Sequence, residues 1–200
     1  MNKFRDLTIQ EGLLKEAIRN FNTEGRACIL RALELAKEAH NGQKRDEGDP
    51  YIIHPIRVAN TLIYNLGIID CDMVSAGLLH DVVEDTEVPL EEIQKRFGER
   101  VAEFVEFMTR DKEKETKKEK YDKIILESQE LKVIKACDWL DNLRSCVYRV
   151  DRGERWQRHL REDEEMYLPL AKIVGDKWLI AEMIKAHGEV LRVNARNQII

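Results

Sequence analysis

Apolar side chains recur at helical spacing along most of the chain, and this pattern predicts a protein built almost entirely from α-helices. The clearest stripe consists of Leu90, Ile93, Phe97, Val101, Phe104, Val105 and Met108. Pro89 precedes it, at a position where the first turn of a helix tolerates proline. The stripe therefore predicts a helix over 90–108 with one face toward the core.

The same spacing predicts further helices, and two polar stretches interrupt them. These helices are expected over 29–40, 55–66, 71–80, 121–129, 131–149, 166–174 and 177–192. Residues 41–50 contain two glycines and a proline, which indicates a long exposed loop. Residues 111–120 carry mixed charge and no apolar side chain, so we interpret them as a solvated connection or a mobile helix end rather than a binding patch. Residues 151–165 are similarly polar. The fold class is thus expected to be all-α.

Length and charge limit the possible functions. Two hundred residues suit a single domain spanning 1–200. The net charge of −5 argues against nucleic acid or a membrane surface as a general partner, although a local basic pocket is compatible with it. No run reaches the roughly 18 to 20 apolar residues of a membrane span, and the N-terminus lacks a secretory signal, so we expect a cytoplasmic protein. The four cysteines form no C-x-x-C pair and are expected to be reduced thiols.

Candidate chemistry is concentrated in GLLHDVVEDT, residues 77–86. Carboxylates beside buried apolar surface are costly unless a cation or a proton neutralises them. His80 offers a nitrogen ligand and Asp81 an oxygen ligand, both suited to a divalent metal ion. A His-Asp dipeptide alone is weak evidence for a metal site, so the argument depends on the other candidate ligands in the sequence.

That context is a second histidine and a later acid on other predicted helices. Taken alone, His54 is a helix cap or a packed polar group, and Asp138 is a boundary acid paired with Lys135 or Arg144. Together with His80 and Asp81, they give two nitrogens and two carboxylates, a set that leaves room for water. Ligands on separate helices are typical of a site in the core of a helical bundle.

Three further polar residues are candidates for chemistry near this centre. Glu84 and Asp85 lie four residues after His80 and Asp81, so a continuous helix would place them one turn further along the same face. They could orient or deprotonate water, or simply form a polar helix end. Asn142 lies one turn after Asp138 and can offer a donor and an acceptor to a substrate. Asp141 is expected to be solvated.

Four motifs resemble one known family. They are AHNGQKR (39–45), GDPYIIHP (48–55), LLHDVVEDT (78–86) and KACDWLDNLR (135–144). In order and spacing they resemble the HD-domain hydrolases of the RelA/SpoT type, especially the small stand-alone alarmone hydrolases related to the metazoan SpoT homologue. The similarity extends over about 26–191.

The resemblance implies an all-α HD-domain bundle with one divalent ion, usually manganese, in its core. It implies metal ligands His54, His80, Asp81 and Asp138, water-activating residues Glu84 and Asp85, and substrate-binding residues Arg45, Asn142 and Ser145. Arg45 would pack against the base, and Asn142 and Ser145 would hold the sugar-phosphate end. The implied reaction is hydrolysis of the 3′-pyrophosphate of guanosine tetra- or pentaphosphate, which gives pyrophosphate and GDP or GTP.

The chain also departs from this family pattern. Asp46 and Glu47 follow Arg45 where the family often has a basic and a small residue, and they add negative charge near a polyanionic substrate. Trp139 and Asp141 replace a commonly basic residue and a common histidine. The length leaves no room for the synthetase domain of the long relatives, so no net synthesis is expected. Another nucleotide substrate, or a non-catalytic nucleotide sensor, stays open as an alternative, and so does the oligomeric state.

Overall fold

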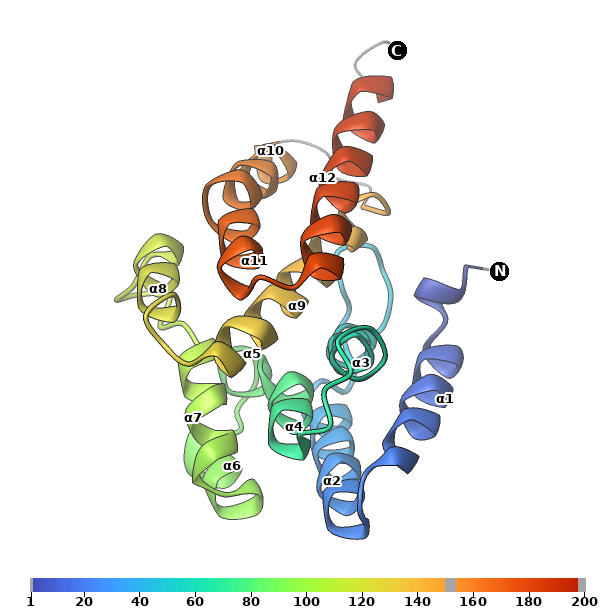
Figure 1. Ribbon diagram of the computed structural model, residues 1–200, viewed down its shortest axis with the longest axis vertical. Helices are drawn as coiled ribbons and strands as arrows, with labels where there is room; N and C mark the ends of the chain where they lie inside the picture. The colour runs from blue at the N-terminus through green and yellow to red at the C-terminus, as the bar shows by residue number, and fades with distance from the viewer. Residues whose placement is uncertain (1, 150–153, 198–200) are drawn as a thin grey trace.

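The computed structural model describes residues 2–149 and 154–197, and every regular element in these ranges is helical (Figure 1). The elements are η1 (Lys3–Arg5), α1 (Leu7–Ala17), η2 (Ile18–Asn20), α2 (Thr23–Ala39), α3 (Ile53–Asn60), the π-helix η3 (Thr61–Asn65), α4 (Cys71–Leu79), α5 (Val82–Asp85), α6 (Leu90–Phe97), α7 (Glu99–Met108), α8 (Lys117–Ile124), α9 (Gln129–Cys146), α10 (Glu154–Glu162), the π-helix η4 (Asp163–Tyr167), α11 (Leu168–Val174) and α12 (Lys177–Asn197). The predicted all-α class is confirmed. In these ranges, no helix is both long and apolar enough to cross a membrane.

Gly98 divides the helix predicted over 90–108 into α6 and α7. Its φ of 90° lies in the left-handed region that glycine adopts without strain. The apolar stripe nevertheless continues across the break, because Ile93, Val101 and Val105 are all fully buried. The spacing of the apolar residues thus predicted the buried face correctly, but the prediction of a single helix over 90–108 was wrong.

Several helices begin earlier than the apolar pattern predicted, because capping side chains stabilise their first turns. The Asn22 side chain accepts a hydrogen bond from the Gly25 N–H, so α2 begins at Thr23 rather than Ile29. Thr116 and Glu119 form a reciprocal capping box, and α8 therefore begins inside the mixed-charge run. Helix α8 ends at Ile124, so the helix predicted over 121–129 was displaced. Helices α1 and α10 were not predicted.

Helix α9 runs through the middle of the molecule (Figure 1) and contributes to two hydrophobic cores. Its residues Ile134 and Cys137 join the core built largely from α2, α3, α4, α6 and α7. Its residues Trp139, Leu140 and Leu143 join the core shared with α10, α11 and α12. A helix that is apolar around most of its circumference is held on all sides. The polar side chains of α9 therefore have fixed positions.

Helices α3 and α4 pack closely beneath the predicted metal centre. All eight residues of α3 are buried, including His54. An added Cβ at Gly77 in α4 would lie 2.9 Å from Leu62 Cδ1, so glycine permits this close approach. The same turn of α4 leads directly into His80 and Asp81.

Candidate active site

Side chains from three parts of the fold meet at one centre: the ligand atoms of His54, His80 and Asp81 all lie within 4.8 Å of one another, and Asp138 lies beside both histidines. His54 comes from α3, His80 and Asp81 from the junction of α4 and α5, and Asp138 from α9. His54 Nε2 lies 3.1 Å from His80 Nε2 and 3.1 Å from Asp138 Oδ1. Asp81 Oδ2 lies 3.1 Å from His80 Nε2 and 3.6 Å from His54 Nε2. His80 Nε2 and Asp138 Oδ1 are 3.6 Å apart.

These separations fit a set of ligands around one metal ion. Histidine nitrogens and carboxylate oxygens bind divalent ions at about 2.0–2.2 Å, so neighbouring ligands lie roughly 3.0–3.6 Å apart. The observed distances of 3.1–3.6 Å fall in this range. The set of two nitrogens and two carboxylates also has the composition expected for such a site.

The hydrogen bonds of the two histidines aim both Nε2 atoms at the centre. His54 Nδ1 lies 2.7 Å from Asp141 Oδ2, and His80 Nδ1 lies 2.9 Å from the Gly77 carbonyl oxygen. Since each Nδ1 contacts an oxygen on the far side of its ring, each Nε2 is directed at the centre. The two nitrogens lie 3.1 Å apart beside two carboxylates, an arrangement that a cation between them would stabilise. The donor set therefore fits a metal ion.

The electrostatics of the centre favour positive charge. Burial opposes protonation of His80, but the carboxylates of Asp81 and Asp138 outweigh it and raise its pKa well above the usual value. Burial would raise the pKa of Asp138, but the ammonium of Lys135 and the nearby histidines hold it well below its usual range. Lys135 Nζ lies 2.8 Å from Asp138 Oδ2. Asp138 thus has both of its expected partners, Lys135 on one oxygen and the histidines on the other.

The two acids of α5 lie at the edge of this centre. Glu84 Oε2 accepts a hydrogen bond from the Arg110 backbone N–H at 2.8 Å, and Glu84 Oε1 lies 3.2 Å from Lys112 Nζ. Lys112 also lies 2.9 Å from Asp85 Oδ1. Helix α4 ends at Leu79 and α5 begins at Val82, so the helix does not continue and the condition for a shared helical face is not met. They line the cleft from a separate short helix.

Tyr51 joins the metal-ligand set to the second acid. Its hydroxyl lies 2.7 Å from Asp81 Oδ2 and 3.0 Å from Asp85 Oδ2. Burial and the adjacent carboxylates raise the pKa of Tyr51, so it remains a hydroxyl donor. Tyr51 was not predicted as a site residue. Its position in the motif GDPYIIHP, three residues before His54, could have indicated it.

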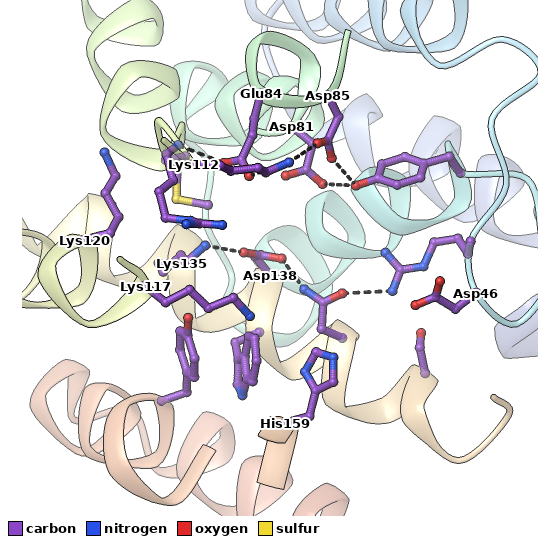
Figure 2. A pocket seen from close by; sticks show the side chains of 18 of the residues that line it. Asp46, Asp81, Glu84, Asp85, Lys112, Lys117, Lys120, Lys135, Asp138 and His159 are labelled. Atoms are coloured by element: carbon purple, nitrogen blue, oxygen red, sulfur yellow. Dashed lines mark hydrogen bonds and ion pairs between the residues drawn. The ribbon is translucent and has the colours of Figure 1, made fainter. Parts of the chain in front are cut away.

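A cleft of about 390 Å³ opens beside the centre (Figure 2). Asp81, Asp138, Glu84 and Asp85 line it, as do all three predicted substrate-binding residues. Its basic side chains include Lys44, Arg45, Arg110, Lys112, Lys117, Lys120, Lys135 and Arg149. Lys112, Lys117, Lys120 and Lys135 gather on one side, away from Asp46 (Figure 2). The segment 111–120 is a connection that leads into the first turn of α8, as expected, and three of its lysines, Lys112, Lys117 and Lys120, also line the cleft.

The predicted substrate residues form a connected row. Arg45 Nη2 donates to Asn142 Oδ1 at 2.9 Å, and Asn142 Nδ2 donates to Asp138 Oδ1 at 2.7 Å. Ser145 also lines the cleft, but its Oγ accepts a hydrogen bond from Arg57 Nη2 at 2.9 Å and the residue is 1% exposed. The row thus connects the loop that carries Arg45 to the metal centre.

The two acids after Arg45 are paired within the protein. Glu47 Oε1 accepts from Arg45 Nε at 3.1 Å, and Asp46 forms an ion pair with Arg149. These pairs neutralise the negative charge that the sequence places next to a polyanion. The two acids therefore present less repulsion than their position in the sequence indicates.

Asp141 is not solvated, and that expectation was wrong. It is 3% exposed and accepts hydrogen bonds from both His54 and Arg57. Arg57 comes from α3, 84 positions earlier in the chain, and its charge neutralises a carboxylate that looks isolated in the sequence. A pairing across helices of this kind leaves no local sequence signal.

An all-helical fold with two histidines and two aspartates at one centre is typical of the HD class of proteins. The chain belongs to the HD domain family, which matches residues 32–175. It is 40% identical over 181 residues to a guanosine-3′,5′-bis(diphosphate) 3′-pyrophosphohydrolase of Aquifex aeolicus, a match that covers 88% of this chain and 25% of the relative. It is 35% identical over 192 residues to the bifunctional (p)ppGpp synthase/hydrolase SpoT of Escherichia coli, covering 90% of this chain and 27% of that protein. The chain thus spans about a quarter of the length of these curated relatives.

A solved structure resembles the chain over most of the length of both proteins. It is described as a metazoan ortholog of SpoT that hydrolyzes ppGpp and plays a role in starvation responses. The TM-score is 0.67 at 30% sequence identity, and the match covers 80% of this chain and 93% of that one. The predicted resemblance to SpoT-type HD proteins is confirmed.

Proposed function

We propose that this protein is a metal-dependent hydrolase that removes the 3′-pyrophosphate of guanosine tetra- or pentaphosphate. The observation that carries the proposal is the convergence of His54, His80, Asp81 and Asp138 on one point, at the edge of a cleft lined by lysines. The names of the SpoT-type relatives support the substrate class.

The four converging side chains would hold one divalent ion, and we propose manganese. When bound, such an ion supplies Lewis-acid stabilisation of phosphoryl oxygens and lowers the pKa of water. The protein contributes two histidines whose Nδ1 atoms are already engaged and two carboxylates whose pKa values are lowered, so the ligand atoms are preorganised in position. The proton that the raised pKa of His80 favours there would be replaced by a bound metal ion.

Glu84 and Asp85 would orient the attacking water and take its proton. Both carboxylates line the cleft, and hydrogen bonds fix them from three directions, through the Arg110 backbone, Lys112 and Tyr51. A carboxylate held in this way can act as a general base within hydrogen-bond reach of a water. Their position at the edge of the centre favours this role over that of further metal ligands.

The remaining walls of the cleft suit a nucleotide with two charged ends. Lys112, Lys117 and Lys120 would face phosphate groups, because they gather on one side of the cleft (Figure 2). Arg45 would stack on the guanine, since Glu47 and Asn142 hold its planar guanidinium in place. Asn142 and Ser145 would meet the sugar-phosphate between them. The remaining sequence-based proposals are one domain over 1–200, a cytoplasmic location, and no nucleic-acid or membrane partner.

A panel of nucleotides tests the proposal. The protein with Mn²⁺ would be offered guanosine tetraphosphate, GTP, a nucleoside monophosphate, a deoxynucleoside triphosphate and a phosphorylated dinucleotide cofactor. We expect the highest kcat/KM for guanosine tetraphosphate. A higher value for any other nucleotide would replace the proposed substrate, and tight binding of guanosine tetraphosphate without turnover would indicate a sensor.

A further inference from the structure

Asp141 forms a buried ion pair behind the metal centre. Arg57 Nε donates to Asp141 Oδ1 at 2.7 Å, and Arg57 Nη2 donates to Asp141 Oδ2 at 2.9 Å. Both side chains are 3% exposed. This bidentate geometry fixes the plane of the carboxylate, which is the property that distinguishes arginine from lysine as a partner.

The same carboxylate reaches a candidate metal ligand. Asp141 Oδ2 lies 2.7 Å from His54 Nδ1, on the side of the imidazole opposite the centre. A carboxylate that accepts the Nδ1–H fixes both the tautomer and the ring orientation, and it makes Nε2 a better donor to a metal. Asp141 itself is no part of the converging set, because its two oxygens are occupied by Arg57 and His54.

Arg57 is itself fixed by contacts outside the ion pair. Its guanidinium lies 3.9 Å from the centre of the Phe4 ring, and its Nη1 donates to the Phe4 carbonyl oxygen at 3.2 Å. Its Nη2 also donates to Ser145 Oγ. The N-terminal segment and α9 thus hold Arg57 from two sides, and Arg57 in turn holds Asp141.

We propose that Asp141 is a positioning residue that fixes His54 as a metal ligand, and that Arg57 fixes Asp141 for this purpose. The inference rests on the metal centre of the proposed function and is independent of the substrate. It assigns a role to the residue that the sequence analysis placed in solvent.

The main test removes both charges together. Asp141→Leu combined with Arg57→Met replaces the ion pair by apolar side chains, so neither variant residue leaves an unpaired buried charge; such exchanges are often neutral or stabilising. His54 then loses its acceptor, and we expect the dissociation constant for Mn²⁺, measured on the metal-free protein by calorimetric titration, to rise by about 10- to 100-fold.

Two single variants separate positioning from a general effect on folding. Asp141→Asn places an NH2 against Arg57 Nε and leaves that arginine without its carboxylate, so its melting curve is checked first. Where it folds, it should lose much less affinity, because an amide oxygen at the Oδ2 position still accepts from His54 and Arg57 Nη2. Asp163→Asn is the matched control, because Asp163 is fully buried and bonded to His187 Nδ1 at 2.6 Å, and His187 is no candidate ligand. This control should bind Mn²⁺ as tightly as the unaltered protein.

The outcomes separate this inference from the proposed function. A folded double variant, checked by its melting curve, that binds Mn²⁺ as tightly as the unaltered protein overturns the positioning role and leaves the metal centre intact. Asp141→Asn binding as weakly as the double variant also contradicts orientation through the Nδ1 hydrogen bond. Failure of the unaltered protein to bind Mn²⁺ overturns the metal centre itself and this inference with it.

Discussion

Asp81 and Glu84 lie three residues apart, but their contacts assign them different chemistry. Asp81 Oδ2 faces His80 Nε2 at 3.1 Å, inside the converging set. Glu84 faces the Arg110 backbone and Lys112 at the edge of the cleft. At the scale of single residues, metal binding and water activation are therefore separable by substitution.

Asp81→Ala should lose metal and activity together, because it removes one of the proposed metal ligands. Glu84→Gln should retain the metal and lower kcat by about a hundred- to ten-thousand-fold, the usual effect of removing a general base. Metal content per protein and kcat would be measured for both. Glu87→Gln, an exposed glutamate three residues later, is the control and should behave as the unaltered protein. Full activity in Glu84→Gln would contradict its proposed role.

Most of the candidate site residues could be predicted from the sequence, but some residues that hold them in place could not. The proposed metal ligands and the α5 acids could be predicted because they occur in short motifs whose residue types indicate their chemistry. Tyr51 was missed, although it lies within a motif, because its role depends on contacts with Asp81 and Asp85 in other elements. Lys135 was predicted as a partner of Asp138, to which it is bonded. Asp141 was misassigned because its partner Arg57 is 84 positions away in sequence.

At the scale of elements, α8 and the segment before it contribute three lysines to one side of the cleft: Lys112, Lys117 and Lys120. Lys120 on α8 lines the cleft, and burial lowers its pKa. Lys123, one turn further along the same helix, is 64% exposed in its side chain and pairs with Glu115. Composition alone could not distinguish these two lysines, because only the packing of α8 decides which of them faces inward.

Lys120→Ala should raise KM for guanosine tetraphosphate by about three- to tenfold, because it removes one cation from the phosphate-facing wall. The dependence of kcat/KM on salt should also become weaker, since fewer charges attract the substrate. Lys123→Ala is the matched control and should change neither quantity. Equal effects of the two substitutions would contradict a specific phosphate-binding side.

Asp70 begins α4 and also binds α7. Its carboxylate accepts hydrogen bonds from the Asp72 and Met73 N–H groups and pairs with Arg100. Burial would raise the pKa of Asp70, but the hydrogen bonds from Arg100 and the backbone lower it overall. The stabilisation is therefore present above the unfolded-state pKa of about 3.9 and is lost as the pH falls through the lower folded-state pKa.

Asp70→Ala should lower the free energy of unfolding by about 1 kcal/mol at neutral pH, the usual cost of losing a helix N-cap. The difference from the unaltered protein should shrink below about pH 4. Urea unfolding of the metal-free protein at both pH values measures it. Asp122→Ala, at an exposed i,i+4 pair with Lys118, is the control and should have a smaller effect at neutral pH. A difference that grows on acidification would contradict the assigned pKa direction.

At the scale of the whole molecule, α9 couples the metal centre to both hydrophobic cores. Asp138 and the core residues of α9 lie on one continuous helix of 18 residues. The ligands also come from α3 and the α4–α5 junction, so an ion bound there would join elements that are distant in sequence. The sequence predicted these helices individually, but not that α9 lies between two cores, because its apolar residues surround the helix and show no single buried face.

Metal binding should therefore raise the melting temperature of the whole protein. With free Mn²⁺ at about 100 times its dissociation constant, linkage gives about 2.7 kcal/mol, which corresponds to roughly 5–10 °C for a protein of this size. Calorimetric melting with Mn²⁺ and with a chelator would measure the shift. Asp81→Ala should show little or none. An equal shift in that variant would place the stabilising ion elsewhere.

Phosphorus NMR of guanosine tetraphosphate hydrolysis tests the central claim most directly. With Mn²⁺ present, we predict equal amounts of pyrophosphate and GDP, with hardly any orthophosphate, and the reaction should stop when a chelator removes the metal. Orthophosphate as the first product, or an undiminished rate in the chelator, would contradict a metal-dependent 3′-pyrophosphohydrolase.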